Sequence, residues 1–329
     1  FSGISSRVRV PALASINKKT WVLGAIKVAI SAGLIIWVFS DIDLALLGAR
    51  LKSISIPALA LAFGLEIIAI GITAWRWKII LGTQELPMKY WDVYRVTYIS
   101  LFINQALPTN LAGDAFRMWH IFKGGSAPLR AMVSVGLDRI AALVGLVILI
   151  TFGLPFLTEL EGDSRLPATL GGLVLAVFTS VGIMIVFHRI PLWQRLFTLP
   201  VIGALFTWAK DISTASKKTF LAGGQTVLCL FLSTLVHLLT VSAILALAAG
   251  LGIYLEPGLA LALVPPVILA SVIPLSYAGW GLREGAMAFF LGFAGIAPEA
   301  ALSLSLIFGV GLLATTLPGG VIWLIQPRQ

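Results

Sequence analysis

The feature that most constrains this chain is a series of apolar runs, each long enough to cross a lipid bilayer as a helix. A membrane-spanning helix needs about 20 predominantly apolar residues. Only 11% of the 329 residues are charged, against about 25% in a typical soluble domain. The sequence therefore predicts an all-α polytopic membrane protein that forms a single membrane domain over residues 1–329. Six full transmembrane helices are expected, at residues 21–40, 56–80, 131–155, 168–187, 225–250 and 300–325.

Two further apolar stretches, 91–122 and 258–296, are each interrupted by nearly the same phrase: "LPTNLAGDAFR" at 107–117 and "IPLSYAGWGLR" at 273–283. Proline and glycine end a helix and let the chain turn. Irregular backbone at membrane depth is tolerated only where protein buries it or where it lines a watery cavity. We therefore expect two re-entrant hairpins, although two ordinary short spans remain an alternative for 258–296. The hairpin breaks are expected at Pro108, Gly113, Pro274, Gly279 and Gly281.

The lysines and arginines of the loops predict the orientation. If the N-terminus is cytoplasmic, segments 1–20, 76–95, 117–130, 188–222 and 326–329 lie inside and hold seventeen basic residues. The external loops then hold three, Arg50, Lys52 and Arg165. By the positive-inside rule, we expect a multi-pass protein of the cell (inner) membrane with both termini cytoplasmic.

The order of the spans predicts an inverted repeat. Three full spans separate the two hairpins, so the hairpins enter from opposite faces, and the repeat halves cover about 56–155 and 222–325. Many transporters bind substrate where the broken helices of such repeats meet. In residues 192–220, apolar residues recur at helical spacing among an arginine and lysines: Leu192, Leu196, Leu199, Ile202 and Phe206. This pattern predicts either a helix lying on the cytoplasmic surface or an ordinary basic connector.

Ionisable residues at membrane depth are costly and therefore mark functional candidates. Arg117 and Arg283 each follow a break, near the free N–H groups and partial positive charge of a helix N-terminus. This combination suits a phosphate group. The alternative is that both arginines only form ion pairs for assembly, and we expect Asp138 and Arg139 to be such a structural ion pair. The further substrate-binding candidates are Asp114, Glu284, Asn110, Ser276, Tyr277 and Glu66.

Signs of enzymatic chemistry are few. His120, His188 and His237 lie far apart, and Cys229 is the one cysteine, so we expect neither a metal site nor a cofactor. The net charge of +9 is scattered over membrane loops, which argues against nucleic acid as a partner. The motif "DID" at 41–43 leaves one alternative open, because an acidic pair at a span end can hold a divalent metal in a membrane-embedded transferase.

Four segments together resemble one known family. They are "FINQALPTNLAGDAFRMW" at 102–119, "GLDRIAAL" at 136–143, "PLSYAGWGLREGAMAFFLGFAGI" at 274–296 and "LPGG" at 317–320. They are similar to the lysylphosphatidylglycerol synthase transmembrane family, a flippase-like membrane domain found alone or fused to an aminoacyl-lipid synthase. Gly281, Arg283 and Glu284 stand where that pattern has them.

The resemblance implies a transporter-like protein rather than an enzyme. It would move or present a phospholipid, aminoacyl-lipid, hopanoid or glycolipid, with membrane lipids as partners and a separate lipid-synthesis enzyme as a further one. The alternatives are a membrane-embedded glycosyl- or lipid-transferase that uses Asp41 and Asp43, and a non-catalytic scaffold for a lipid-synthesis enzyme. The oligomeric state is left open.

Overall fold

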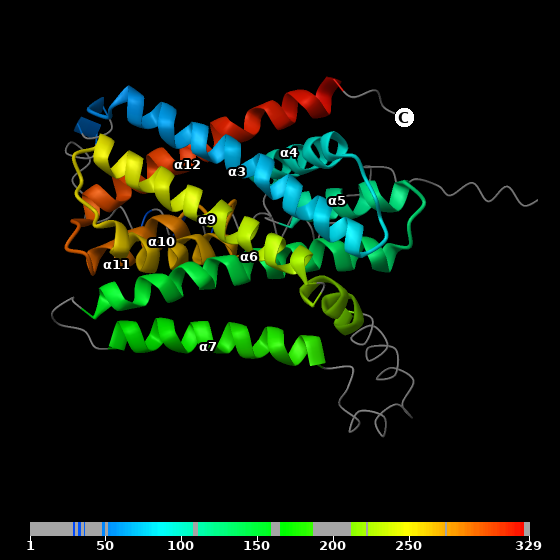
Figure 1. Cartoon of the computed structure of the whole chain (residues 1–329). Coiled ribbons are helices and arrows are strands. Elements are labelled where there is room, and N and C mark those ends of the chain that lie inside the picture. Colours follow the sequence, from blue (N-terminus) through cyan, green and yellow to red (C-terminus); the bar gives the residue numbers. More distant parts are fainter. Residues whose placement is uncertain are drawn as a thin grey trace, which may run out of the picture.

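The computed structural model describes residues 52–107, 111–158, 165–186, 212–221, 223–273 and 275–325, with a few positions between 29 and 49. Within these ranges the chain forms helices and no strand. The long helices run side by side along one direction (Figure 1). The elements are α3 (Ile56–Thr83), α4 (Tyr90–Ala106), α5 (Ala112–Lys123), α6 (Pro128–Leu157), α7 (Arg165–Val186), α9 (Gly224–Gly250), α10 (Pro257–Val272), α11 (Leu282–Gly292) and α12 (Pro298–Ile325).

Five of these helices, α3, α6, α7, α9 and α12, are long and apolar enough to cross a membrane. They hold 22 to 30 residues, which at 1.5 Å per residue makes each about 33–45 Å long. Their bounds fall within a few residues of five predicted spans. The sixth, 21–40, lies almost entirely outside the described residues. Of the segment 192–220, only residues from 212 on are described, and they are helical. The polytopic membrane class is confirmed.

The two repeated phrases fall between pairs of short helices. The first separates α4 from α5, and the second separates α10 from α11. The pair α4–α5 connects to α3 and α6 at one end of the bundle, whereas α10–α11 connects to α9 and α12 at the other (Figure 1). In the second phrase Ala278, Gly279 and Gly281 have φ of 48°, 81° and 85°, a left-handed conformation that interrupts the helix and that glycine adopts at low cost. Pro108 and Pro274 lie outside the described residues.

Glycines allow the first helix of each short pair to lie close to a long helix. A Cβ atom on Gly153 of α6 would overlap the backbone of Ala262 in α10. On α12, a Cβ on Gly319 would overlap the backbone of Tyr98 in α4. The Tyr98 hydroxyl also donates to the carbonyl of Thr315, at 2.8 Å. Each short pair is therefore held against the last long helix of the other half of the chain.

The largest apolar core lies between α6, α9, α10, α11 and α12, with residues of α7 at its side. It includes Leu247, Leu263, Met287 and Leu304, all fully buried. A smaller core, around Trp77, Val93 and Ile121, joins α3 to the pair α4–α5. The two short pairs are thus packed inside protein on their inner sides, which is the condition for broken helices at membrane depth.

Candidate functional site

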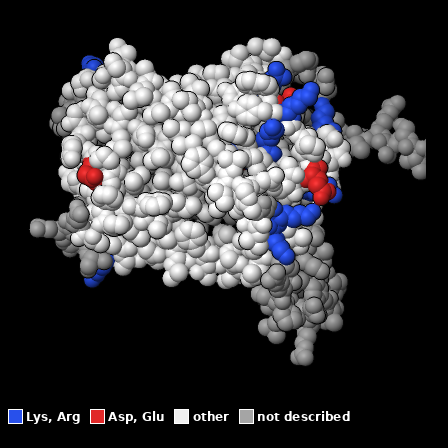
Figure 2. Space-filling model, viewed as in Figure 1, with Lys and Arg blue, Asp and Glu red and all other residues white. Residues whose placement is uncertain are grey.

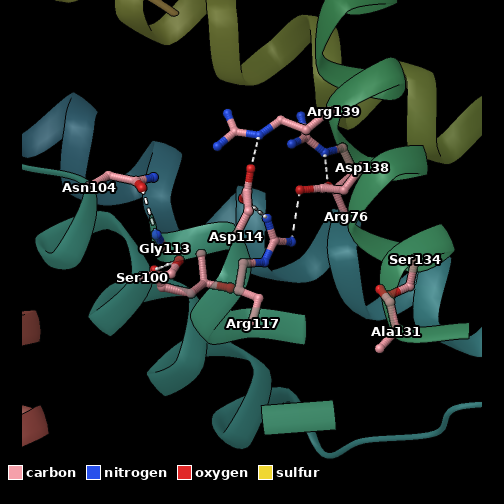
Figure 3. Close-up of polar contacts among 11 residues, drawn as sticks. Arg76, Ser100, Asn104, Gly113, Asp114, Arg117, Ala131, Ser134, Asp138 and Arg139 are labelled. Carbon is pink, nitrogen blue, oxygen red and sulfur yellow. Dashed lines mark hydrogen bonds and ion pairs between the residues drawn. The ribbon is translucent and has the colours of Figure 1, made fainter. Parts of the chain in front are cut away.

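Five charged side chains meet beside the first break, and we name them the α5–α6 charge cluster: Arg76, Asp114, Arg117, Asp138 and Arg139 (Figure 3). Asp138 accepts from Nε of Arg76 and from Nη2 of Arg117, each at 2.8 Å. Asp114 accepts from Nε of Arg139 at 2.8 Å and lies 3.6 Å from Nη1 of Arg117. The contacts join α3, α5 and α6 in one polar network.

The local sequence explains how α5 presents its two charges. Gly113 lets α5 lie directly on α4, because a Cβ there would overlap the carbonyl of Ser100. The N–H of Gly113 donates to Oδ1 of Asn104 at 2.8 Å, which fixes the start of α5 against the end of α4. Asp114 and Arg117, three positions apart, then share one helix face. That face is turned toward α6.

Burial divides this charge cluster in two. Arg76, Asp114, Arg117 and Asp138 are all buried, and the guanidinium of Arg117 lies 3.8 Å from the ring centroid of Trp77, a cation–π contact that favours a desolvated arginine. The Arg139 side chain is 41% exposed. Three arginines face two aspartates, so the cluster carries one excess positive charge.

The expected pairing of Asp138 with Arg139 is replaced by two pairings across helices. Asp138 binds Arg76 and Arg117, whereas Arg139 binds Asp114. Adjacent residues of an α-helix point about 100° apart, because one turn takes 3.6 residues. Asp138 therefore faces α3 and α5 in the interior, while Arg139 faces the start of α5. Both residues still connect helices, but not to one another.

A second, smaller cluster lies beside the second break. Glu284 accepts from Nη2 of Arg283 at 2.6 Å, from the hydroxyl of Ser305 at 3.1 Å and from the N–H of Gly281 at 2.6 Å. The last bond caps the start of α11. A Cβ on Gly309 of α12 would overlap the guanidinium of Arg283, so this glycine provides the space for it. One arginine faces one carboxylate, and the cluster is electrically balanced.

The second break touches the end of α4, the helix that leads into the first break. The hydroxyl of Tyr277, in the second phrase, donates to the carbonyl of Ala106, the last residue of α4, at 2.9 Å. Arg117 and Arg283 belong to separate clusters, because among the described residues no ion pair or hydrogen bond joins one cluster to the other. The candidate site therefore consists of two broken helices in contact, with one arginine–carboxylate cluster beside each.

Two of the remaining candidates, Ser276 and Glu66, lie in the described part of the chain. Ser276 is fully buried, and its hydroxyl has no hydrogen-bond partner among the described residues. Glu66 of α3 is buried, and its Oε1 likewise has none in that part of the chain. Asn110, Asp41 and Asp43 lie outside the described residues. The described residues contain no group of three metal-ligating side chains.

Sequence reasoning missed Arg76. The sequence predicts a basic loop from residue 76, but α3 continues to Thr83 and buries Arg76 among helices. The signal that could have found it is the apolar "IIL" at 79–81. That run extends the helical pattern beyond the arginine, so Arg76 lies within the helix rather than after it.

These features define the class of the protein: a polytopic helical membrane protein with ionisable residues buried beside broken helices. The transmembrane region of lysylphosphatidylglycerol synthase provides the family, because its family model matches residues 24–319, nearly the whole chain. The chain belongs to this family, as its motifs indicated. No curated protein matches it closely enough to count as a relative. Family and architecture together make it a lipid-related membrane protein.

Proposed function

We propose that the protein moves, or presents, the headgroup of a membrane lipid across the inner membrane, passing it between the two broken helix pairs. The contact between the breaks, from Tyr277 to Ala106, is the observation that carries this proposal. In it, α4–α5 and α10–α11 are re-entrant hairpins that enter from opposite faces. Their attachment at opposite ends of the bundle supports this arrangement (Figure 1).

The glycines of the long helices support an inverted repeat. The two phrases begin at residues 107 and 273, an offset of 166 positions. The same offset carries Gly153 onto Gly319 and Gly145 onto Gly311. Gly145 of α6 abuts Ser233 of α9, and Gly311 of α12 abuts Phe63 of α3. Equivalent glycines therefore make equivalent contacts in the two halves, α6 with α9 and α10, and α12 with α3 and α4.

The clusters suggest how a charged headgroup could cross. Moving an unpaired charge into the bilayer is the main energetic obstacle. Arg117 and Arg283 are already held at depth beside carboxylates, so an approaching phosphate meets a guanidinium fork that is already in place. At Arg117 it can take the position of Asp114, because Asp114 keeps Arg139 as its partner. The acyl chains would stay in the bilayer. Membrane lipids are the proposed substrates, and a separate lipid-synthesis enzyme is a proposed partner that supplies them.

Arg283→Lys tests this function. Lysine keeps the charge but loses the two-pronged geometry that suits phosphate. We expect movement of a fluorescent phospholipid between the leaflets of proteoliposomes to fall about tenfold, while the protein still folds because lysine keeps the charge opposite Glu284. Arg130→Lys, on an exposed ion pair with Glu85, is the control and should move lipid like the unmodified protein. Unimpaired movement by a stable Arg283→Lys protein would argue against the function.

The proposed orientation has its own test. Lysines and arginines gather at the end of the molecule where α4 and α5 connect to α3 and α6 (Figure 2), which we assign to the cytoplasm. After Cys229 is replaced, a cysteine at exposed Tyr254, between α9 and α10, should react with a membrane-impermeant maleimide from outside intact cells. A cysteine at exposed Lys218 should react only after lysis. The opposite pattern would reverse the topology.

A further inference from the structure

The excess positive charge of the α5–α6 charge cluster resides on an arginine with unused donors. Nε of Arg139 donates to Asp114, but in the described part of the chain its Nη1 and Nη2 atoms make no hydrogen bond. The other two arginines, Arg76 and Arg117, share Asp138, and of their buried nitrogen atoms only Nε of Arg117 is left without a partner among the described residues. A guanidinium with free terminal nitrogens needs an acceptor, because these are strong hydrogen-bond donors.

Arg139 lies at a depth where an arginine without an acceptor is costly. It lies eleven residues after Pro128, the first residue of α6, which is about 16 Å along the helix. That depth falls inside a hydrocarbon core about 30 Å thick. An exposed arginine there is costly, and the counter-charge of Arg139, Asp114, also faces Arg117. The cost indicates a use for the charge rather than an incidental surface residue.

The surface around Arg139 is open and offers a second donor. A Cβ on Gly136, one turn earlier in α6, would meet nothing within 4 Å. Figure 3 shows the terminal nitrogens of Arg139 directed away from Asp138, on the side of Asn104. Asn104 uses Oδ1 to accept from Gly113, and its Nδ2 has no acceptor among the described residues. Free donors of α6 and α4 thus lie on the same side of Asp114, beside the first break.

We propose that Arg139 and Asn104 form a binding site for the phosphate of an anionic lipid headgroup, deep in the bilayer beside the first break. The guanidinium fork matches two phosphate oxygens, and the start of α5 adds a partial positive charge on the same side. The phosphate restores the charge balance of the cluster. The site rests on the proposed function, since it names the lipid class that function acts on, but lipid binding can be measured without any translocation.

The charge count also predicts which variant is safe to test. Without Arg139, the cluster keeps Arg76 and Arg117 against Asp114 and Asp138, which is a balanced set. Asp114 retains Arg117 as its partner at 3.6 Å. Arg139→Gln should therefore fold with thermal stability equal to or above that of the unmodified protein. A residue with only a structural role in the cluster would lower it.

The experiment measures binding of phosphatidylglycerol to the full-length protein in a neutral detergent. We expect Arg139→Gln to bind it about tenfold more weakly, because hydrogen bonds between ionised groups are the strong ones. Arg130→Gln makes the same charge change on the same helix, at an exposed position paired with Glu85, and should stay within about twofold of the unmodified protein. Diacylglycerol, which lacks the phosphate, should bind all three proteins alike.

Other outcomes would overturn the site. Equal phosphatidylglycerol binding by the unmodified protein and Arg139→Gln would reject the site. A loss of binding in Arg130→Gln as large as that in Arg139→Gln would also reject it, because it would indicate a diffuse charge effect. Inorganic phosphate that binds as tightly as the lipid would indicate a free-anion site instead. If Arg139→Gln unfolds, the prediction that the remaining cluster is balanced is wrong. Arg139→Lys then tests the binding site: a loss of phosphatidylglycerol affinity of a few-fold supports binding by the guanidinium, and an unchanged affinity rejects it.

The same proteins separate the site from the function. Arg139-dependent lipid binding by a protein that moves no lipid in vesicles would leave the site standing and reject the translocase. Lipid movement by a protein whose phosphatidylglycerol binding does not depend on Arg139 would support the translocase and reject the site.

Discussion

Replacing Asp138 with asparagine is expected to lower the free energy of unfolding by about 3–5 kcal/mol, the usual cost of breaking a buried ion pair. Asp138 accepts from Arg76 and Arg117, each at 2.8 Å, and all three side chains are buried. Asparagine keeps the shape but removes the charge that both arginines share. The variant leaves three arginines of the cluster against one aspartate.

The measurement is thermal and chemical denaturation of the purified protein in detergent. Glu85→Gln is the control, because Glu85 also pairs with two basic residues, Arg130 and Lys218, but all three are well exposed. Exposed pairs contribute at most about 1 kcal/mol, so this variant should be nearly as stable as the unmodified protein. If the free energy of unfolding of Asp138→Asn lay within about 1 kcal/mol of that of the unmodified protein, Asp138 would not hold a costly buried ion pair.

A double variant tests whether charge or shape causes the loss. Arg76→Gln combined with Asp138→Asn removes one charge of each sign and leaves Arg117 and Arg139 against Asp114. The excess is then one positive charge, as in the unmodified cluster. We expect the double variant to be more stable than Asp138→Asn alone, a coupling that contacting residues of one network commonly show.

The positions of the helices followed from local signals. Hydropathy runs located five spans to within a few residues, because the requirement for about 20 apolar residues is set by the bilayer and not by tertiary contacts. The two interruptions followed from proline and glycine, which act on the backbone where they stand. These parts of the fold needed no knowledge of which helix packs on which.

The partners of the charged residues could not be obtained in the same way. Asp138 and Arg139 are neighbours in sequence, yet they bind residues 62 and 25 positions away. Those choices depend on how α3, α5 and α6 are rotated about their axes, which no local pattern specifies. Arg76 was missed for a related reason, since whether a residue near a span end is buried depends on the neighbours that extend beyond it.

The substitution of Gly153 or Gly319 by alanine is expected to cost about 1–3 kcal/mol each, the usual penalty for overfilling a packed interior. In both cases the added Cβ would overlap backbone atoms of a neighbouring helix, Ala262 of α10 or Tyr98 of α4. Backbone atoms cannot move aside as a flexible side chain can, so a short helix pair must shift as a whole.

The control lies on α3. A Cβ on Gly64 would meet nothing within 4 Å, so alanine there should be neutral or should stabilise the helix by up to about 1 kcal/mol. The same denaturation series applies to all three proteins. If Gly153 and Gly319 hold equivalent helix pairs of an inverted repeat, their alanine variants should show similar losses, and the double variant should show roughly their sum, since distant sites act independently. A large loss at one glycine and none at the other would break the equivalence between α6 with α10 and α12 with α4. It would remove the packing argument for an inverted repeat while leaving the two charge clusters in place, because Arg117 and Arg283 are each held by contacts that do not involve either glycine.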